Sequence, residues 1–503
     1  MEGRVRQHYN LTLAILATAG TAFALQQTMV IPALPALQRE LQTTTTWITW
    51  VLTVFLLVAS VATPILGKLG DQFGKERLLT ISLGLFLAGC VGCAVAWDVW
   101  SLIAFRAVSG LGAAVFPLSF AIIRDEFPPE KVGVGIGLVS AVFGVGGGFG
   151  IVLSGLIVDH LSWRWLFIVG AVAVAGGLVL VHRFVPESPV KTPSRVDVPG
   201  AVLLSGGLIA LLLALTEGET WGWLSGRILG LFGAALVLLV VWGWFETRVP
   251  QPLVDMRMLA RRPVLLTNLT ALIAGFAMFG TFVLIPNFVE MPNGVPARWE
   301  GLVHYGFHAS ATKAGLYLLP SSVTLLFAGP LAGVIGRRVG MKWPLAAGML
   351  LVAVSAASLA LWHDHPWQIL APMPFLGVGV GFAFAAMATL IAEAVRPTET
   401  GVATGMNTVM RTVGGVVGGQ MGAALLSAYT ISGTGVPSAT GFELTFTIGA
   451  CAALTGAVLA IFVTRQRPHA APQPAFMPAA AKTARNRSTS GAQGTSYTKR
   501  PLG

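Results

Sequence analysis

The stretch GKLGDQFGKERLL, residues 67–79, concentrates charge between two long apolar runs. Five of its thirteen residues are charged, in a chain where Asp, Glu, Lys and Arg make up 11% of residues. Asp71 supplies a carboxylate that can lie at a helix N-terminus or pair with a cation across an interface. Lys75 and Arg77 can instead simply anchor the segment, because basic residues flank membrane spans on the cytoplasmic side. A charged contact between helices and a topological anchor are therefore the two interpretations of this stretch.

Polar residues also lie inside the apolar runs, where they are costly. Arg106 is a lone charge in such a run, and an arginine at the centre of a spanning helix costs about 2.5–3.5 kcal/mol on the insertion scale. It should face a bundle interior or a wet cavity, either to handle protons or substrate or as a structural hydrogen-bond donor. Arg411 is similar, with Asn407 one helical turn earlier on the same face. These two residues can contact a substrate or only hold neighbouring helices together.

The composition is that of a membrane protein. Of the 503 residues 54% are hydrophobic, and the mean hydropathy is +0.75. A soluble domain has about a quarter charged residues, so this chain cannot cover a water-facing surface. Apolar runs of 18 or more residues recur along it, each long enough to cross the bilayer as a helix. We therefore expect an all-α integral membrane protein with the lipid bilayer as its surroundings.

The formal net charge of +11 does not indicate a nucleic-acid partner, because much of the excess lies in one tail. Residues 465–503 hold seven Lys or Arg and no acidic residue. This Pro-, Ala- and Ser-rich segment has the composition of a disordered tail. The cysteines fall inside apolar runs without accompanying His clusters, so we expect no metal site.

Breaks at charges and at Pro/Gly clusters divide the chain into fourteen expected spans. They are 11–33, 47–66, 78–97, 100–123, 132–158, 164–182, 198–216, 227–246, 264–289, 314–336, 344–361, 369–392, 401–430 and 442–464. An even number of spans places both termini on one side of the membrane. That side holds 25 of the 32 Lys and Arg, and the other side holds five. The excess of positive charge predicts a multi-pass plasma-membrane protein with both termini in the cytoplasm.

The chain also repeats itself. PILGKLGDQFGKERL from Pro64 aligns without gaps on PLAGVIGRRVGMKWP from Pro330, which places Arg337 at the position of Asp71. GVGIGLVSAVFGVGGGFG from Gly133 aligns on GVATGMNTVMRTVGGVVG from Gly401, at nearly the same offset. The matches relate spans 1–6 to spans 9–14 in a parallel repeat. Transporters with two such halves hold the substrate between them, near the middle of the membrane.

The repeat divides the chain into five expected regions. They are a cytoplasmic N-terminus (1–10), an N-terminal six-helix bundle (11–185), two inserted helices (198–246), a C-terminal six-helix bundle (264–464) and the basic cytoplasmic tail (465–503). The two bundles would carry the transport site, and the inserted pair has no counterpart in the repeat.

With the repeat established, residues 67–79 resemble the signature of the major facilitator superfamily between spans 2 and 3. Gly67, Asp71, Gly74, Lys75 and Arg77 fit that pattern. Fourteen spans, and the stretches SWRWLF (162–167), LTEGETWGW (215–223) and GVATGMNTVMRTVGGVVGG (401–419), resemble the fourteen-helix drug:proton antiporter branch. The resemblance implies a gating role for the signature, and the two glycines permit close backbone approach.

A second family motif lies in the fifth span, where Gly146, Gly150 and Gly155 match it in part. The family has a proline after the second glycine and a glycine where this chain has Ser154. The spacing of the glycines still favours close helix packing. A bend that depends on the proline is not expected here.

The largest departure from the family is in the first span. The branch usually carries an Asp in this stretch, and here LQQTMVIPALP places Gln26 at that position. A glutamine cannot take up or release a proton near neutral pH. Three explanations of coupling stay open: Asp71 or another acid near the end of a span titrates, the substrate is neutral or anionic with Arg106 and Arg411 compensating its charge, or transport follows the substrate's own gradient.

These observations predict a secondary active transporter, not an enzyme, that exports amphipathic small molecules by alternating access with the proton as coupling ion. Gln26, Arg106, Asn407 and Arg411 are the candidates for coupling or substrate contact. We expect no cofactor and a monomer, with methionines such as Met406 suiting an adaptable apolar cavity. The alternatives are a proton-independent facilitator or importer of a neutral or anionic metabolite, and a non-transporting receptor or assembly component.

Overall fold

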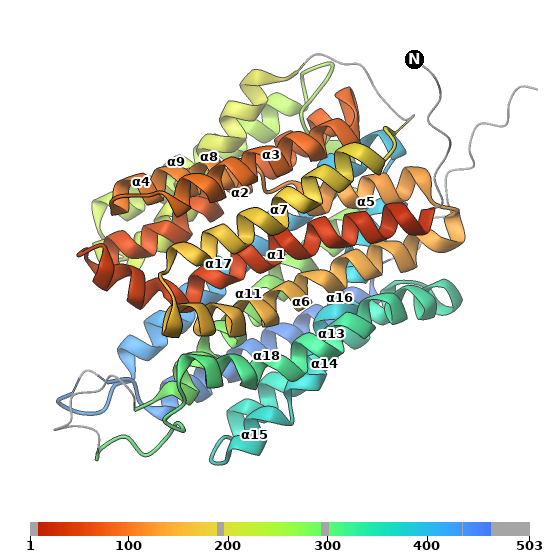
Figure 1. Cartoon of the computed structure of the whole chain (residues 1–503). Coiled ribbons are helices and arrows are strands. Elements are labelled where there is room, and N and C mark those ends of the chain that lie inside the picture. Colours follow the sequence, from red (N-terminus) through yellow and green to blue (C-terminus); the bar gives the residue numbers. More distant parts are fainter. Residues whose placement is uncertain (1–8, 189–195, 293–300, 435, 464–503) are drawn as a thin grey trace, which may run out of the picture. The chain divides into compact units, whose positions relative to one another are not determined.

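The computed structural model describes residues 9–188, 196–292, 301–434 and 436–463. The expected tail 465–503 and most of the segment 1–10 lie outside these residues. The described residues are helical throughout and form no β-strand beyond one isolated bridge between Thr430 and Pro437. Helices therefore make up the whole described architecture (Figure 1).

The first half contains seven helices, which cover the six expected spans. They are α1 (Tyr9–Glu40), α2 (Thr45–Phe73), α3 (Lys75–Ala94), α4 (Val99–Leu111), α5 (Val115–Glu126), α6 (Pro129–His160) and α7 (Arg164–Phe184). The expected span 100–123 is divided into α4 and α5, which the sequence did not indicate. Between them the backbone tightens, with Gly112 N–H bonded to the Ser109 carbonyl and Ala113 N–H to the Gly110 carbonyl.

The remaining helices comprise the insertion and the second half. The insertion is α8 (Val198–Trp221) and α9 (Gly226–Glu246), followed by the short α10 (Met256–Leu259). The second half is α11 (Arg262–Glu290), α13 (Ala311–Val339), α14 (Lys342–Leu361), α15 (Pro366–Leu370), α16 (Met373–Ala394), the 3₁₀ turn Pro397–Glu399, α17 (Thr400–Ala428) and α18 (Ala439–Ile461). Each of the fourteen expected spans therefore falls on a helix or on a pair of helices.

Twelve segments among the described residues are long and apolar enough to cross a membrane. The expected spans on α11 and α17 are not among them. In α11 the apolar segment is the shorter Arg262–Met278. Helix α17 carries Asn407, Arg411 and several threonines. The structure therefore shows a multi-pass helical membrane protein, and the number fourteen remains a prediction.

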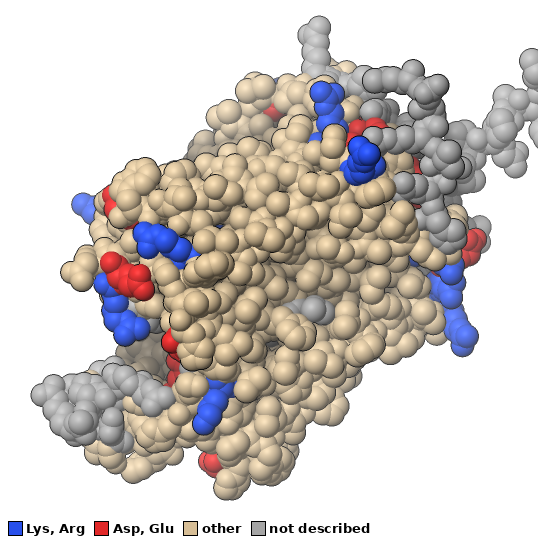
Figure 2. Space-filling model, in the orientation of Figure 1, with Lys and Arg blue, Asp and Glu red and all other residues tan. Residues whose placement is uncertain are grey.

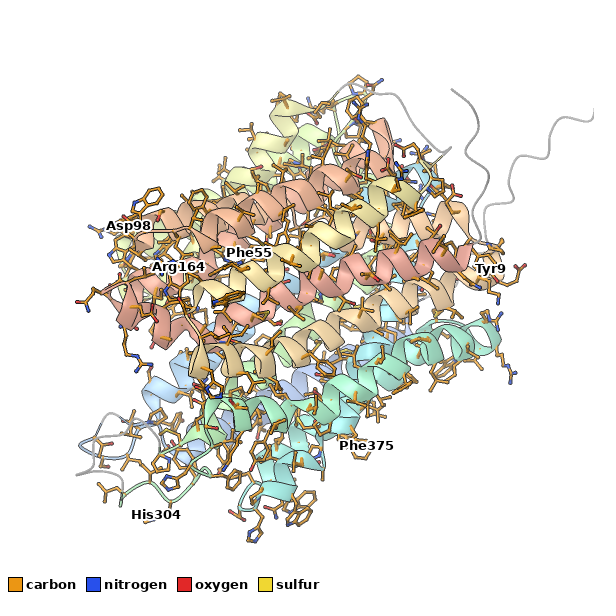
Figure 3. The ribbon with its side chains drawn as sticks, viewed as in Figure 1. Tyr9, Phe55, Asp98, Arg164, His304 and Phe375 are labelled. Atoms are coloured by element: carbon orange, nitrogen blue, oxygen red, sulfur yellow. The ribbon has the colours of Figure 1, made fainter. Side chains whose placement is uncertain are left out.

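Charges gather at the ends of the helices. On the face in Figure 2, blue and red residues lie at both ends, and an uncharged band separates them. Figure 3 places Tyr9 at one end and Asp98, Arg164 and His304 at the other, with Phe55 between the ends. The sequence assigned Arg164 to the side opposite the termini, and the structure places it at the end opposite Tyr9.

Several helices begin where the sequence provides a capping side chain. The Asp98 carboxylate accepts a hydrogen bond from Ser101 N–H at 2.8 Å, and Asp197 accepts one from Gly200 N–H at 2.9 Å. The hydrogen bonds from Ser101 hold the pKa of Asp98 below its ordinary value. These caps fix the first turns of α4 and α8.

Two seams, one between α2 and α17 and one between α6 and α13, join the halves. At the first, a side chain on Gly67 would meet the backbone of Gly401, and at the second a side chain on Gly333 would meet the backbone of Gly133. The repeat equates Gly67 with Gly333 and Gly133 with Gly401, so the two seams are the same contact made twice. Glycine is required because only a residue without a Cβ lets two backbones approach this closely.

Each half has an apolar core of its own. In the first half Phe23, Phe55 and Phe86 lie together, with ring centroids 4.7–6.4 Å apart. A further cluster joins Leu57 of α2 and Leu208 of α8 to the buried face of α17. The inserted helix α8 therefore packs beside the first seam, where it contacts a helix from each half.

We predict that Gly67→Ala destabilises the contact between α2 and α17. The added Cβ would lie 2.7 Å from the Gly401 carbonyl carbon, and a backbone cannot move aside as a flexible side chain does. Overpacking of this kind costs about 1–3 kcal/mol. The thermal unfolding midpoint in detergent should fall. Gly84→Ala is the matched control, since nothing lies within 4 Å of its new Cβ. Equal midpoints for the two variants would contradict the prediction.

Candidate functional site

Asp71 lies in the last turn of α2 and connects the halves. Its side chain is 1% exposed, and its carboxylate accepts hydrogen bonds from Gly401 N–H at 3.3 Å and Val402 N–H at 3.2 Å. These are the first free amides of α17, so the negative charge lies at the positive end of a helix in the other half. Of the two arrangements expected for Asp71, the structure shows the helix N-terminus.

The turn that presents Asp71 is shorter than the sequence suggested. Helix α2 continues to Phe73 and α3 begins at Lys75, so Gly74 alone joins them. Gly74 has φ +122°, a conformation that favours glycine, and its N–H bonds to the Gly70 carbonyl. Most of the segment 67–77 between the expected spans is therefore helix.

Lys75 is the cation beside Asp71, and it comes from the same half. Its side chain is 0% exposed, with Nζ 3.7 Å from Asp71 Oδ1 and paired closely with Asp125 of α5. Nζ also donates to the Pro397 carbonyl at 3.4 Å, in the second half. One buried ammonium therefore lies beside two buried carboxylates, and its charge offsets part of the cost of burying them.

Arg124, next to Asp125, completes the contact. Its guanidinium donates to the carbonyls of Val395 at 2.7 Å and Arg396 at 3.2 Å, and to the Thr400 hydroxyl at 2.5 Å. We call Asp71, Lys75, Arg124 and Asp125, with the segment 395–402 that they bind, the clamp. The sequence patterns did not single out Arg124 or Asp125 as site residues. The signal in the sequence for these two residues was that they form an adjacent pair of opposite charges at the end of an expected span.

Arg77 of the signature does not join the clamp. Its side chain is exposed in the first turns of α3. It lies outside the contact between the halves, whereas Asp71 and Lys75 are buried in that contact.

Two small cavities meet at Arg411, between the two halves. The larger, about 60 Å³, is bounded by α1, α2, the α4–α5 segment and α17, and the smaller by α5, α6, α16 and α17. Arg411 lines both, with its guanidinium carbon 4.2 Å from the centre of the Phe384 ring. A volume of this size holds a few water molecules rather than a drug-sized ligand.

Asn407 lines the smaller cavity, but its amide is also bound within the second half. It donates to Asn268 Oδ1 of α11 at 3.0 Å. Beyond it, side chains on Gly414 and Gly418 would meet the α11 backbone at Leu272 and Phe276. This face of α17 therefore packs on α11, and Arg411 turns to the cavity. Asn268, a polar residue in the middle of an apolar run, was overlooked.

Gln26 and Arg106 do not line the cavities, contrary to their grouping with Asn407 and Arg411. Gln26 is 0% exposed and faces α7, where a side chain on Gly170 would meet its amide. Arg106 Nε donates to the Val51 carbonyl at 3.1 Å, and the guanidinium lies over Phe55 at 4.4 Å. Both belong to the interior of the first half, where Gln26 contacts α7 and Arg106 contacts α2.

The glycines of α6 take part in helix packing on two sides. Side chains on Gly146 and Gly150 would meet α1 at Leu25 and Thr28, and one on Gly155 would meet Thr312 of α13. Ser154, which stands where the family has a glycine, donates its hydroxyl to the Met29 carbonyl of α1 at 2.5 Å. The serine thus adds a hydrogen bond at a position where close packing was expected.

Among the described residues, no methionine lines either of the two cavities at Arg411. Met406 is 3% exposed within the cluster beside α8. Aromatic rings line the cavities instead, among them Phe23, Phe55, Phe116 and Phe384.

A helical membrane protein with two repeated halves around a central cavity is a secondary transporter by architecture. The sequence model of the Major Facilitator Superfamily matches residues 16–306 and 295–498. The chain belongs to this superfamily and is a multi-pass membrane transporter.

Its relatives include named export proteins. The tetracenomycin C resistance and export protein of Streptomyces glaucescens is 28% identical over 377 residues, which are 74% of this chain and 67% of that protein. Multidrug resistance protein 3 of Bacillus subtilis is 29% identical over 69% of this chain and 66% of its own length. The chain thus spans about two thirds of these relatives.

Among solved structures, the human organic anion transporter MFSD10 (TETRAN) matches with a TM-score of 0.65 over 90% of this chain and 100% of that chain. At 14% identity this likeness shows the fold alone.

We predict that Lys75→Ala strongly destabilises the protein. It would leave Asp71 and Asp125 buried with like charge and no ammonium between them, and breaking a buried ion pair costs about 3–5 kcal/mol. The thermal unfolding midpoint of the purified protein in detergent measures the loss. Arg77→Ala, a basic residue two positions along but exposed, is the control and should change little. A larger loss in Arg77→Ala would contradict the burial argument.

Proposed function

We propose that this chain exports amphipathic small molecules across the plasma membrane by alternating access, with both termini in the cytoplasm and the proton as coupling ion. The position of the clamp carries this proposal. The clamp joins the halves on the side predicted to be cytoplasmic, and the cavities lie between the same halves. The names of the relatives support export of drug-like compounds. The chain acts as a monomer, without cofactor or nucleic acid.

In this conformation the cytoplasmic gate is closed. The Asp71 carboxylate holds α17 of the second half, and Arg124 holds the segment before it. A substrate reaches the cavity from the cytoplasm only when these bonds break and the Gly67–Gly401 contact separates. Hydrogen bonds to charged groups contribute about 1.5–3 kcal/mol each, so the clamp favours the closed gate by an amount that a ligand can reverse.

Asp71 is the coupling residue in this proposal. Its charge is what attracts the α17 amides and Lys75. Protonation removes that charge and weakens both contacts, so proton uptake would open the gate toward the cytoplasm and deprotonation would close it again. Asp71 can perform this step without the span-1 Asp that Gln26 replaces.

A facilitator or importer of a neutral or anionic metabolite is the second candidate. One observation favours it: the residues lining the two cavities include no carboxylate. Such a transporter would work without a proton gradient and would need the clamp only as a gate.

We predict that export of a drug-like probe from proteoliposomes depends on an imposed pH gradient and that Asp71→Asn abolishes this dependence. The variant keeps the shape of the side chain but loses the charge that responds to protons. Initial export rates with and without the gradient measure the effect. Asp364→Asn, at an exposed carboxylate, should behave as the unaltered chain. Gln26→Asp restores an acid in the first span and tests whether a carboxylate at that position can also couple export to the proton gradient.

Export that is equal with and without the gradient in the unaltered chain would favour the facilitator. Gradient-dependent export that survives in Asp71→Asn would remove Asp71 from coupling.

A further inference from the structure

The side chains that line the cavities carry charge of one sign, which is positive. Their lining residues come from both halves, and Arg411 is the one charged residue among them. A guanidinium is never deprotonated under physiological conditions, so the cavities carry a permanent positive charge. In a site with low dielectric constant, this charge repels a cationic ligand and attracts an anionic one.

The cavities also contain hydroxyl groups whose hydrogen-bonding capacity is unused. Ser60 of α2 lines the larger cavity and Ser140 of α6 the smaller, each 3% exposed. Neither hydroxyl has a hydrogen-bond partner among the described residues. Buried polar groups are normally paired, so an unpaired hydroxyl beside a cavity indicates a missing partner. Both can donate a hydrogen bond to an oxygen atom of a ligand held at Arg411.

A second guanidinium lies behind the cavity wall. Phe55 lines the larger cavity, and Arg106 stacks on this ring. Arg106 is 1% exposed, and its Nη1 and Nη2 have no hydrogen-bond partner in the described part of the chain. One aromatic ring therefore separates the cavity from a second permanent cation. This cation adds to the positive potential in the cavity, and its Nη1 and Nη2 donors are not used within the described residues.

The rest of the wall suits the apolar part of a ligand. The rings of Phe23, Phe116 and Phe384 surround the region near Arg411. Aromatic side chains pack on flat apolar groups without regard to their detailed shape. The site therefore combines one guanidinium that can bind an acidic group with aromatic surfaces that accept apolar groups of different shapes.

We propose that the central site selects amphipathic organic anions, in which a carboxylate or sulfonate pairs with Arg411 and receives hydrogen bonds from Ser60 and Ser140. This inference rests on the proposed export function and names its substrate class. The closed cavity admits only water, so the anion binds when the halves separate. Arg106 is a positioning residue that acts through Phe55.

Export from proteoliposomes would compare three dyes: anionic fluorescein, cationic rhodamine 123, which shares the xanthene rings, and neutral Nile red. The unaltered chain should export fluorescein and Nile red and exclude rhodamine 123. Arg411→Gln should lower the rate for fluorescein by about tenfold or more, since a hydrogen-bonded charge is lost. The rate for Nile red should stay within about twofold, because the aromatic surfaces remain.

Three further variants separate charge from structure. Arg411→Lys keeps the charge and should retain part of the fluorescein export. Ser60→Ala combined with Ser140→Ala should raise the KM for fluorescein and leave Nile red unchanged. Arg248→Gln is the matched control, because Arg248 also stacks on an aromatic ring, that of Trp244 at 4.3 Å, but lies at the end of α9.

The outcomes distinguish the two proposals. Export of rhodamine 123 in preference to fluorescein would overturn the anion inference and leave the export function standing. Equal loss of all dyes in Arg411→Gln would show a structural role and would also overturn it. Export of none of the dyes by folded, reconstituted protein would overturn the export function and the anion inference with it.

Discussion

The rest of the molecule depends on one carboxylate placed at the start of a helix in the opposite half. Asp71 lies in the last turn of α2, and its carboxylate accepts hydrogen bonds from the first backbone amides of α17. A negative charge there is stabilised both by the two hydrogen bonds and by the helix dipole. The interaction needs α2 and α17 in contact, which is why glycine occupies position 67 and position 401. The closest backbone approach between α2 and α17 and the carboxylate that binds across it therefore lie side by side.

The second half has the same geometry without the same chemistry. Arg337 takes the position of Asp71 in the repeat, and it donates to the Glu130 carbonyl near the start of α6. An arginine gains nothing from the positive end of a helix, so this contact lacks the electrostatic stabilisation of the clamp. The backbone seams are duplicated, whereas the first has a carboxylate at the start of the facing helix and the second has an arginine there.

The central site follows from the same arrangement. Helix α17 begins at the clamp and carries Arg411 about three turns further along, so one helix links the clamp to the cavity. The inserted helix α8 packs on α2 and α17 through Leu208 and its neighbours. It contacts the two helices that the clamp joins.

The sequence by itself determined the helices, the repeat and the superfamily, because apolar length and spacing are local properties. It also identified Asp71 and Lys75 as special, since charge is rare in this chain. Only the tertiary structure decided what they touch across the halves: the amides that bind Asp71 lie some 330 residues away, and no local pattern encodes that pairing. Arg106 and Arg411 looked alike as lone arginines in apolar runs. Helix packing decides that Arg106 lies inside the first bundle and that Arg411 lies at the cavities. The face that a helix buries depends on the helices beside it.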